Sequence, residues 1–162
     1  MPGDLKPELH IARVDSGDVE FLKLIALLDG ELQERNGEEQ QQYDKYNRVD
    51  YIKDVILIYS DSSAVGCGAF KEFDASTVEV KRIFIRKEYR KQGISKLILK
   101  NLEQLAEVRG YKACILETGL RQLEAINLYK SNGYKIIDNY GPYIGMENSI
   151  CMKKELKTAT EG

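Results

Sequence analysis

The sequence is poor in the residues that build metal centres and disulfide frameworks. It contains one histidine and three cysteines, and His10 has no partner motif around it. Cys67, Cys114 and Cys151 are widely separated, and each lies in an apolar, strand-like run. The pattern therefore predicts no metal site, no histidine-based triad and no disulfide framework. It favours three small, buried hydrophobic side chains instead.

Long apolar runs and proline are also scarce. No window approaches the roughly 18 uncharged apolar residues of a membrane-spanning helix. The first ten residues carry Asp4, Lys6 and Glu8, where a secretory signal has an apolar core. Three prolines and 13 glycines, with 43% hydrophobic and 31% charged residues, are typical of a globular chain. We expect one domain, residues 1–162 with a core at about 10–156, in a cytoplasmic protein that binds no membrane.

Short apolar runs alternate with amphipathic helical patterns along the chain. Strands are predicted at residues 10–14, 54–60, 64–73, 77–85, 112–119, 134–138 and 148–156. Helices are predicted after residues 15–18, after Gly93 and over 123–133. We expect Gly30 to end or interrupt the first helix, and residues 31–49 to form a second, exposed helix or helical loop. The sum predicts an α/β fold, with a mixed, mainly antiparallel central sheet and helices on both faces.

Positive charge is concentrated in one segment, although the formal net charge of the chain is -2. Against the single acid Glu88, residues 81–96 contain seven basic residues: Lys81, Arg82, Arg86, Lys87, Arg90, Lys91 and Lys96. Here a strand leads through a loop with Gly93 into a helix, whose first N–H groups and dipole favour an anion such as phosphate. A solvated basic loop is the alternative. A nucleic-acid-binding module would also need stacking aromatic residues and a basic overall balance, which the net charge argues against.

Two blocks make the chain resemble the GCN5-related N-acetyltransferase (GNAT) family, in its small bacterial-type branch. Residues 90–95, Arg-Lys-Gln-Gly-Ile-Ser, match the acetyl-CoA signature Q/R-x-x-G-x-G/A, except that Ser95 stands where Gly or Ala is usual. Residues 125–129, Ala-Ile-Asn-Leu-Tyr, followed by Gly133 and Tyr134, are similar to a second family block. In that block Gln122 stands where Asn is common, and Tyr134 stands for Phe. The resemblance covers about residues 10–156.

The resemblance implies the GNAT fold and the direct transfer of an acetyl group from the co-substrate acetyl-CoA to an amine. It also implies that backbone groups of residues 83–85 hold the pantetheine arm, where their strand splays from its neighbour near Leu116. The CoA-binding residues implied are Ile83, Phe84, Ile85, Arg90, Lys91, Gln92, Gly93, Ser95, Lys96 and Asn127. A non-catalytic acyl-CoA-binding regulatory module is the alternative, as is an exposed helix position for Asn127.

The resemblance further implies two residues for proton transfer. Tyr129 matches the tyrosine that protonates the leaving thiolate, with a helix tyrosine that packs on the sheet as the alternative. Glu79 lies where many relatives place the carboxylate that accepts the amine proton, directly or through water; a solvated strand residue is the alternative. The acceptor is expected to be a small-molecule or peptide amine, no nucleic acid is expected as a partner, and a homodimer is left open. Candidates for the substrate wall, or else ordinary surface residues, are Tyr43, Tyr46, Asn47, Tyr140 and Tyr143.

Overall fold

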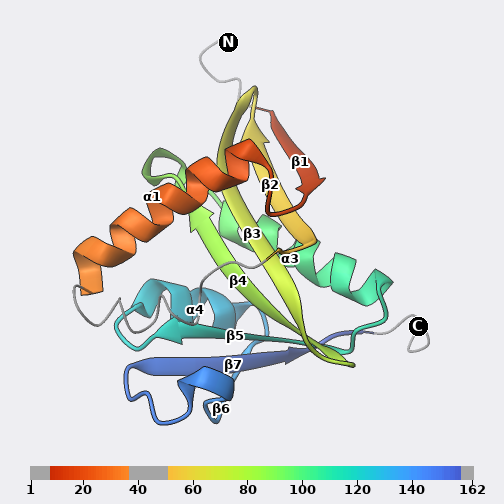
Figure 1. Ribbon diagram of the computed structural model, residues 1–162, viewed down its shortest axis with the longest axis vertical. Coiled ribbons are helices and arrows are strands. Elements are labelled where there is room, and N and C mark those ends of the chain that lie inside the picture. Colours follow the sequence, from red (N-terminus) through yellow and green to blue (C-terminus); the bar gives the residue numbers. More distant parts are fainter. Residues whose placement is uncertain (1–7, 37–50, 158–162) are drawn as a thin grey trace. The chain divides into compact units, whose positions relative to one another are not determined.

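The computed structural model describes residues 8–36 and 51–157, and Figure 1 shows the arrangement of their elements. Hydrogen bonds join the strands in the order β1-β2-β3-β4-β5-β7-β6. The strands are β1 Leu9–Val14, β2 Asp54–Ser60, β3 Ser63–Asp74, β4 Thr77–Ile85, β5 Ala113–Gly119, β6 Lys135–Ile137 and β7 Ser149–Glu155. The helices are α1 Val19–Asn36, α3 Ile94–Val108 and α4 Leu123–Ser131, with 3-10 turns η2 Lys87–Tyr89 and η3 Gly141–Tyr143. The predicted α/β fold class is confirmed.

Strand direction confirms the prediction of a mixed, mainly antiparallel sheet. The pairs β1–β2, β5–β7 and β6–β7 are antiparallel, whereas β4 and β5 are parallel. The parallel ladder is short, because it runs from Thr77↔Ala113 only to Glu79↔Ile115. Val80 and all later residues of β4 therefore have no partner in β5. This confirms the predicted separation of the two strands near Leu116.

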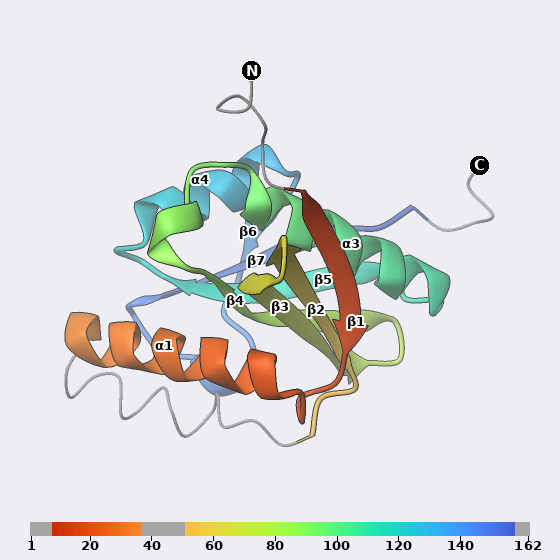
Figure 2. The same cartoon turned by 90° about the horizontal axis from the view of Figure 1, so that it is seen from above.

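The contacts divide the chain into two compact units, each of which is described by itself. The first unit comprises residues 1–69 and 82–98, and the second comprises residues 70–81 and 99–162. In the first unit, α1 runs along one side of strands β1, β2 and β3 (Figure 2). Its buried Phe21 and Leu24 share a core cluster with strand residues such as Leu57 and Cys67. On the opposite face of β3, a Cβ on Gly66 would lie 2.9 Å from Ile85 Cδ1 and 3.2 to 3.3 Å from side-chain carbons of α3. Helices therefore pack on both faces of β3.

Helix α1 continues past Gly30, so the expectation that this glycine ends or interrupts the helix is wrong. The backbone of Gly30 does not adopt a positive φ, and a Cβ there would meet no atom within 4 Å. A helical glycine costs only about 1 kcal/mol. The flanking Asp29 and Glu31 form ion pairs with Arg82 and Arg90, which fix the second half of the helix. The separate helix expected over residues 31–49 is thus a continuation of α1 up to Asn36, and residues 37–49 lie outside the described part.

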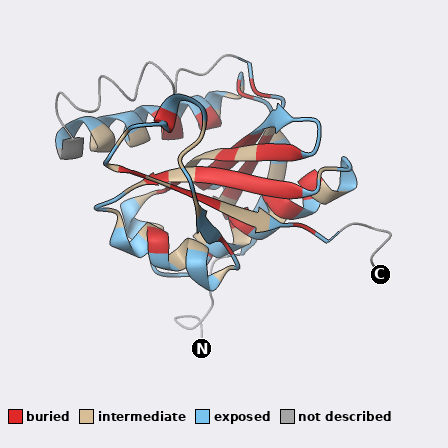
Figure 3. Cartoon of the chain, turned by 90° about the horizontal axis from the view of Figure 1, so that it is seen from below, coloured by how far each residue is buried: buried red, intermediate tan, exposed pale blue. Residues whose placement is uncertain are grey.

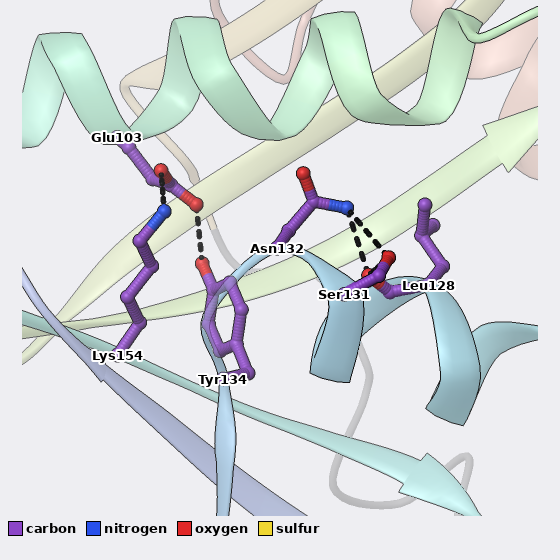
Figure 4. A network of polar contacts seen from close by, with 6 residues as sticks. All are labelled: Glu103, Leu128, Ser131, Asn132, Tyr134 and Lys154. Carbon is purple, nitrogen blue, oxygen red and sulfur yellow. Dashed lines mark hydrogen bonds and ion pairs between the residues drawn. The ribbon is translucent and has the colours of Figure 1, made fainter.

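The second unit is built on strand β5, whose residues 113–116 are all buried. Figure 3 shows that buried residues gather in the strands, whereas much of the helix surface is exposed. A polar network crosses the core of this unit (Figure 4). The Tyr134 hydroxyl donates to Glu103 at 2.9 Å, and Lys154 Nζ lies 2.7 Å from the other oxygen of that carboxylate. Burial, followed by the nearby charges, raises the pKa of Tyr134. The hydroxyl that distinguishes Tyr134 from the usual Phe therefore has its own partner.

All three cysteines are free and buried, which confirms their interpretation as small core side chains. Burial raises the pKa of Cys67 and of Cys114 to about 12. No helix among residues 8–36 and 51–157 is long and apolar enough to cross a membrane.

Candidate active site

The basic loop in the first unit connects β4 to α3 through a tight, unusual backbone path. After the 3-10 turn at 87–89, Lys91 has φ 64° and Gly93 has φ 82°. Lysine in the left-handed region is uncommon, and at Gly93 the absence of a Cβ removes that cost. Lys91, Gln92 and Gly93 are all exposed. The loop therefore presents its backbone to solvent at the start of α3.

Backbone N–H groups are available at this end of α3. The carbonyl of Gly93 accepts the N–H of Leu97 at 3.1 Å, which closes the first helical turn. For the N–H groups of Gly93, Ile94 and Ser95, however, residues 8–36 and 51–157 provide no acceptor. Such groups, at the positive end of a helix dipole and near the exposed Lys91 and Lys96, can bind a diphosphate. The residues predicted for the cradle thus fit an anion.

Arg90 differs from the other residues of the cradle, because its side chain is already engaged. Its Nη2 atom lies 2.9 Å from each oxygen of Glu31, and its Nε donates to the Ile85 carbonyl at 2.8 Å. The guanidinium carbon lies 5.5 Å from the centre of the Phe84 ring. The exposed Gln92 donates from its amide nitrogen to the Glu88 carbonyl at 3.3 Å. In this structure Arg90 therefore holds the loop rather than offering a free charge.

The strand before the loop contains a local break at Arg82, whose φ is 62°. Its carbonyl accepts the thiol hydrogen of Cys67 at 3.3 Å, and its guanidinium lies 3.1 Å from Asp29. A positive φ inside a strand interrupts regular pairing. Ile83 follows the break and is partly exposed, whereas Phe84 and Ile85 are buried. The predicted role of Ile83, Phe84 and Ile85 in holding pantetheine remains a prediction.

Two carboxylates of neighbouring strands form the centre of the second unit. Glu79 accepts a hydrogen bond of 2.6 Å from the Tyr140 hydroxyl and forms an ion pair of 3.4 Å with Lys81. Glu117 of β5 accepts a hydrogen bond of 2.7 Å from the Ser149 hydroxyl of β7. The β5–β7 register explains the second contact, because Glu117 pairs with Cys151 and the next residue on that face is Ser149.

The protonation of Glu117 differs from that of an ordinary glutamate. Burial is the main cause that raises its pKa, and the negative charge of Glu79 adds to it; Ser149 and Lys81 act in the opposite direction. The result is a pKa of about 7. A carboxylate with this pKa can accept a proton and release it near neutral pH, which is what a general base requires.

Tyr129 lies on α4 within the influence of this carboxylate. Burial of its hydroxyl raises the pKa to about 12, and the negative charge of Glu117 contributes to the rise. Its ring packs against Tyr134 with centroids 5.9 Å apart. The role of Tyr129 as proton donor and its alternative, a helix tyrosine that packs on the sheet, both remain predictions. Asn127, two residues earlier, is exposed.

Tyr140, which donates to Glu79, also belongs to a cluster of three aromatic rings. The Tyr140 ring lies 5.2 Å from the Phe73 ring and 5.6 Å from the Tyr143 ring, measured between centroids. The loop that carries Tyr140 and Tyr143 is fixed by Asn139, whose amide donates to two backbone carbonyls at 3.0 Å each. The structure thus places one predicted wall residue, Tyr140, on a carboxylate, and a second, the buried Tyr143, against the Tyr140 ring. The other three, Tyr43, Tyr46 and Asn47, lie outside the described residues.

Glu117, Ser149 and Phe73 were not predicted as site residues. For Glu117 a signal existed, because it is the only charged residue in the strand Ala113–Gly119. An ionisable residue in an otherwise buried strand needs a special explanation. For Ser149 and Phe73 no comparable signal exists, since their places depend on strand register and on ring contacts.

Comparison with known proteins agrees with the geometry of both units. Residues 21–134 match the sequence profile of the Acetyltransferase (GNAT) family. The chain belongs to this family. The chain is similar to the uncharacterised N-acetyltransferase YsnE of Bacillus subtilis, with 36% identity over 93 residues, or 56% of this chain. The match spans only 62% of the length of that GNAT relative.

Solved structures share the fold over almost the whole chain. A Klebsiella pneumoniae protein assigned to the acyl-CoA N-acyltransferases is 33% identical, with a TM-score of 0.77 over 92% of this chain and 98% of its own. A GNAT acetyltransferase from Elizabethkingia anophelis, solved with acetyl-CoA bound, is 20% identical, with a TM-score of 0.68 over 91% of this chain and 98% of its own. The predicted GNAT membership and fold are confirmed.

Proposed function

We propose that this chain is an acetyl-CoA-dependent N-acetyltransferase that acts on a cationic amine. The observation that carries the proposal is Glu117, a carboxylate with a pKa of about 7 whose charge acts on the Tyr129 hydroxyl. Amide formation requires one group to take a proton from the amine and another to give a proton to the leaving thiolate. Membership of the GNAT family supports the reaction class.

Acetyl-CoA would be held by the loop of the first unit. Its diphosphate fits the N–H groups of Gly93, Ile94 and Ser95 and the exposed Lys91 and Lys96, while Asn127 is a candidate for the pantetheine amide. When bound, acetyl-CoA would supply the activated acetyl group and the thiolate leaving group. That a GNAT fold neighbour was solved with acetyl-CoA bound supports this assignment.

The two carboxylates have different roles in the proposal. Glu79 accepts a hydrogen bond from the Tyr140 hydroxyl and forms an ion pair with Lys81, and its carboxylate attracts the ammonium group of the substrate. Glu117 removes one proton from that group and leaves a neutral amine able to attack the thioester. We therefore assign the base to Glu117 rather than to Glu79, for which the family resemblance had implied that role with a solvated strand residue as the alternative.

Tyr129 supplies the proton for the departing sulfur, and the second proton that the amine nitrogen loses as the amide forms restores the Tyr129 hydroxyl. Its hydroxyl remains protonated at neutral pH and can donate to the departing sulfur. Burial is the main cause of the raised pKa of Tyr129, and the negative charge of Glu117 adds to it; proton uptake by Glu117 removes this second contribution. Tyr129 therefore becomes a stronger acid at the stage when its proton is needed.

The acceptor is inferred from the groups around Glu79. Two carboxylates and the rings of Phe73, Tyr140 and Tyr143 favour a positive charge next to an apolar body. They disfavour an acceptor whose amine lies beside a carboxylate. We also propose that the chain forms a single domain of a cytoplasmic protein. Whether it forms a homodimer stays open.

The first test is calorimetric titration of the full chain with acetyl-CoA, with desulfo-CoA and ATP as controls. We expect micromolar binding of acetyl-CoA and desulfo-CoA and much weaker binding of ATP. The second step measures thiol release with cationic alkylamines and with α-amino acids, and the alkylamines should be preferred. Binding without turnover on any amine would favour the non-catalytic acyl-CoA-binding module, and absence of binding would contradict both functions.

A further inference from the structure

The contacts of Arg90 raise the question of what holds the diphosphate loop in its shape. The first signature residue makes a two-pronged ion pair with Glu31, a hydrogen bond to the Ile85 carbonyl and a ring contact with Phe84. Charge-assisted pairs with two hydrogen bonds are among the stronger polar contacts in proteins. The Nη2 atom alone contacts both Glu31 oxygens, while Nε donates to the Ile85 carbonyl. This combination is specific for arginine, because the single ammonium nitrogen of lysine cannot replace two donors fixed in one plane.

The ion pair between Glu31 and Arg90 connects the loop to α1, and α1 contributes a second ion pair from a residue two positions earlier. Asp29 lies 3.1 Å from the Arg82 guanidinium, whose side chain is only 9% exposed. Asp29 and Glu31 flank Gly30, so the two acidic residues reach the break in β4 and the loop from one short stretch of helix. The continuation of α1 beyond Gly30 is what brings Glu31 to Arg90.

The loop needs such an anchor because part of its backbone adopts an unfavourable conformation. Immediately after Arg90, Lys91 and then Gly93 adopt positive φ values. The left-handed region is unfavourable for a non-glycine residue, because its Cβ lies too close to the following carbonyl oxygen. Without an anchor, the loop would sample other paths in which its N–H groups no longer converge. A loop fixed before the ligand arrives binds more tightly, because less ordering remains to be done on binding.

We propose that Glu31 of α1 is a positioning residue for acetyl-CoA binding: it holds Arg90 as an internal anchor of the diphosphate loop, so that backbone N–H groups and not the Arg90 side chain bind the diphosphate. This inference rests on the proposed function, since it takes the loop to be the acetyl-CoA site. It differs from the assignment of Arg90 as a direct ligand of the cofactor. In that alternative, Glu31 competes with the diphosphate for Arg90.

The two assignments predict opposite effects of Glu31→Gln. If Glu31 positions the loop, the Kd of acetyl-CoA rises about tenfold, while kcat at saturating acetyl-CoA changes less than about twofold. Arg90→Lys should weaken binding to a similar extent, although it keeps the positive charge. If Arg90 is a direct ligand restrained by Glu31, Glu31→Gln lowers Kd and Arg90→Lys retains much of the affinity. A lowered or unchanged Kd in Glu31→Gln overturns the inference.

Glu34→Gln is the matched control, because Glu34 lies on the same helix and is exposed. It should leave both Kd and kcat unchanged. Glu31→Asp keeps the charge but shortens the reach, and it should give an intermediate Kd even if Glu31→Gln fails to fold. Failure of the unmodified chain to bind acetyl-CoA would contradict the proposed function itself, whereas binding that is equal in all variants would contradict only the role of Glu31.

Discussion

The proposed diphosphate loop in the first unit and the carboxylates Glu79 and Glu117 in the second unit are both suited to charged ligands, but they use different atoms for this purpose. The loop offers backbone N–H groups at the start of α3, and its most prominent cation, Arg90, is neutralised by Glu31. The pair Glu79 and Glu117 offers side chains, and the pKa of Glu117 depends on burial and on its neighbours. One region is defined by backbone conformation, and the other is defined by the chemical identity of a few residues.

This difference indicates which substitutions each region tolerates. Backbone groups are retained when a side chain changes, so the loop accepts Ser95 where Gly or Ala is usual, provided that the left-handed positions remain accessible. A proton-transfer group cannot be replaced in the same way, because its pKa and its reach both matter. Substitutions of Glu117 and Tyr129 should therefore affect turnover, and substitutions in the loop should affect binding.

Glu117→Gln should have the largest effect on turnover. The amide cannot accept the amine proton, so kcat should fall by about 10²–10⁴-fold, while the Kd of acetyl-CoA stays the same. In the unmodified chain, kcat/KM should fall as the pH drops below about 7, because protonated Glu117 is no longer a base. Steady-state kinetics across pH would measure both effects.

Glu155→Gln serves as the control for this prediction, because Glu155 is exposed on β7. Its pH profile should match that of the unmodified chain. A Glu117→Gln variant that keeps the acidic limb of the profile would show that another group, with Glu79 as the first candidate, is the base.

Tyr129→Phe should have the next largest effect. Loss of the proton donor should reduce kcat by about 10²-fold, with little change in the Kd of acetyl-CoA. Tyr134→Phe is the matched control, since it removes a hydroxyl bound to Glu103 and should lower thermal stability without lowering kcat. Equal losses of turnover and of binding in Tyr129→Phe would assign Tyr129 to packing.

The raised pKa of Glu117 also predicts a dependence of stability on pH. Because the pKa is higher in the folded chain than its ordinary value of 4.5, proton binding favours folding. This contribution is fully present below pH 4.5 and is lost as the pH rises through about 7. Glu117→Gln should therefore raise the free energy of unfolding by about 1–3 kcal/mol at mildly alkaline pH, and by progressively less at acidic pH. Denaturant unfolding at several pH values would test this, and a difference that does not vary with pH would contradict it.

Gly93→Ala should weaken acetyl-CoA binding about tenfold, because alanine at φ 82° is strained by about 1–2 kcal/mol. Lys91→Ala should have a smaller effect, of about threefold or less, since an exposed charge contributes little. Gly110→Ala is the control for backbone strain, because Gly110 has φ 89° but follows the far end of α3. It should lower stability without changing Kd. Calorimetric titration would order the three variants, and a larger effect of Lys91→Ala would favour side-chain binding of the diphosphate.

The sequence predicted the parts of this molecule that depend on local pattern. The strand Thr77–Ile85 has the predicted bounds, and the helix that follows Gly93 is correct, because alternation, helical spacing and glycine act over a few residues. The loop between β4 and α3 was located for the same reason, and its role in binding the diphosphate remains a prediction. The error at Gly30 shows the limit of local reasoning, since ion pairs with residues more than 50 positions away fix that half of α1.

The second unit could be predicted less completely. Glu79 and Tyr140 were named separately, but nothing in the sequence placed the hydroxyl of one on the carboxylate of the other across 61 positions. The pKa of Glu117 likewise depends on burial and on Glu79, which become known only when the strands are paired. Groups whose properties come from tertiary neighbours need a structure, even where the family is evident from the sequence.

The buried cysteines have a practical consequence for measuring turnover. Acetyl transfer liberates a free thiol, and disulfide reagents that report it react with thiolates. Cys67, Cys114 and Cys151 are buried, and their pKa values of about 12, 12 and 11 keep them protonated. The native chain therefore contributes almost no background signal in a thiol assay. A slow rise toward three equivalents of reactive thiol per chain would indicate that the protein unfolds during the assay.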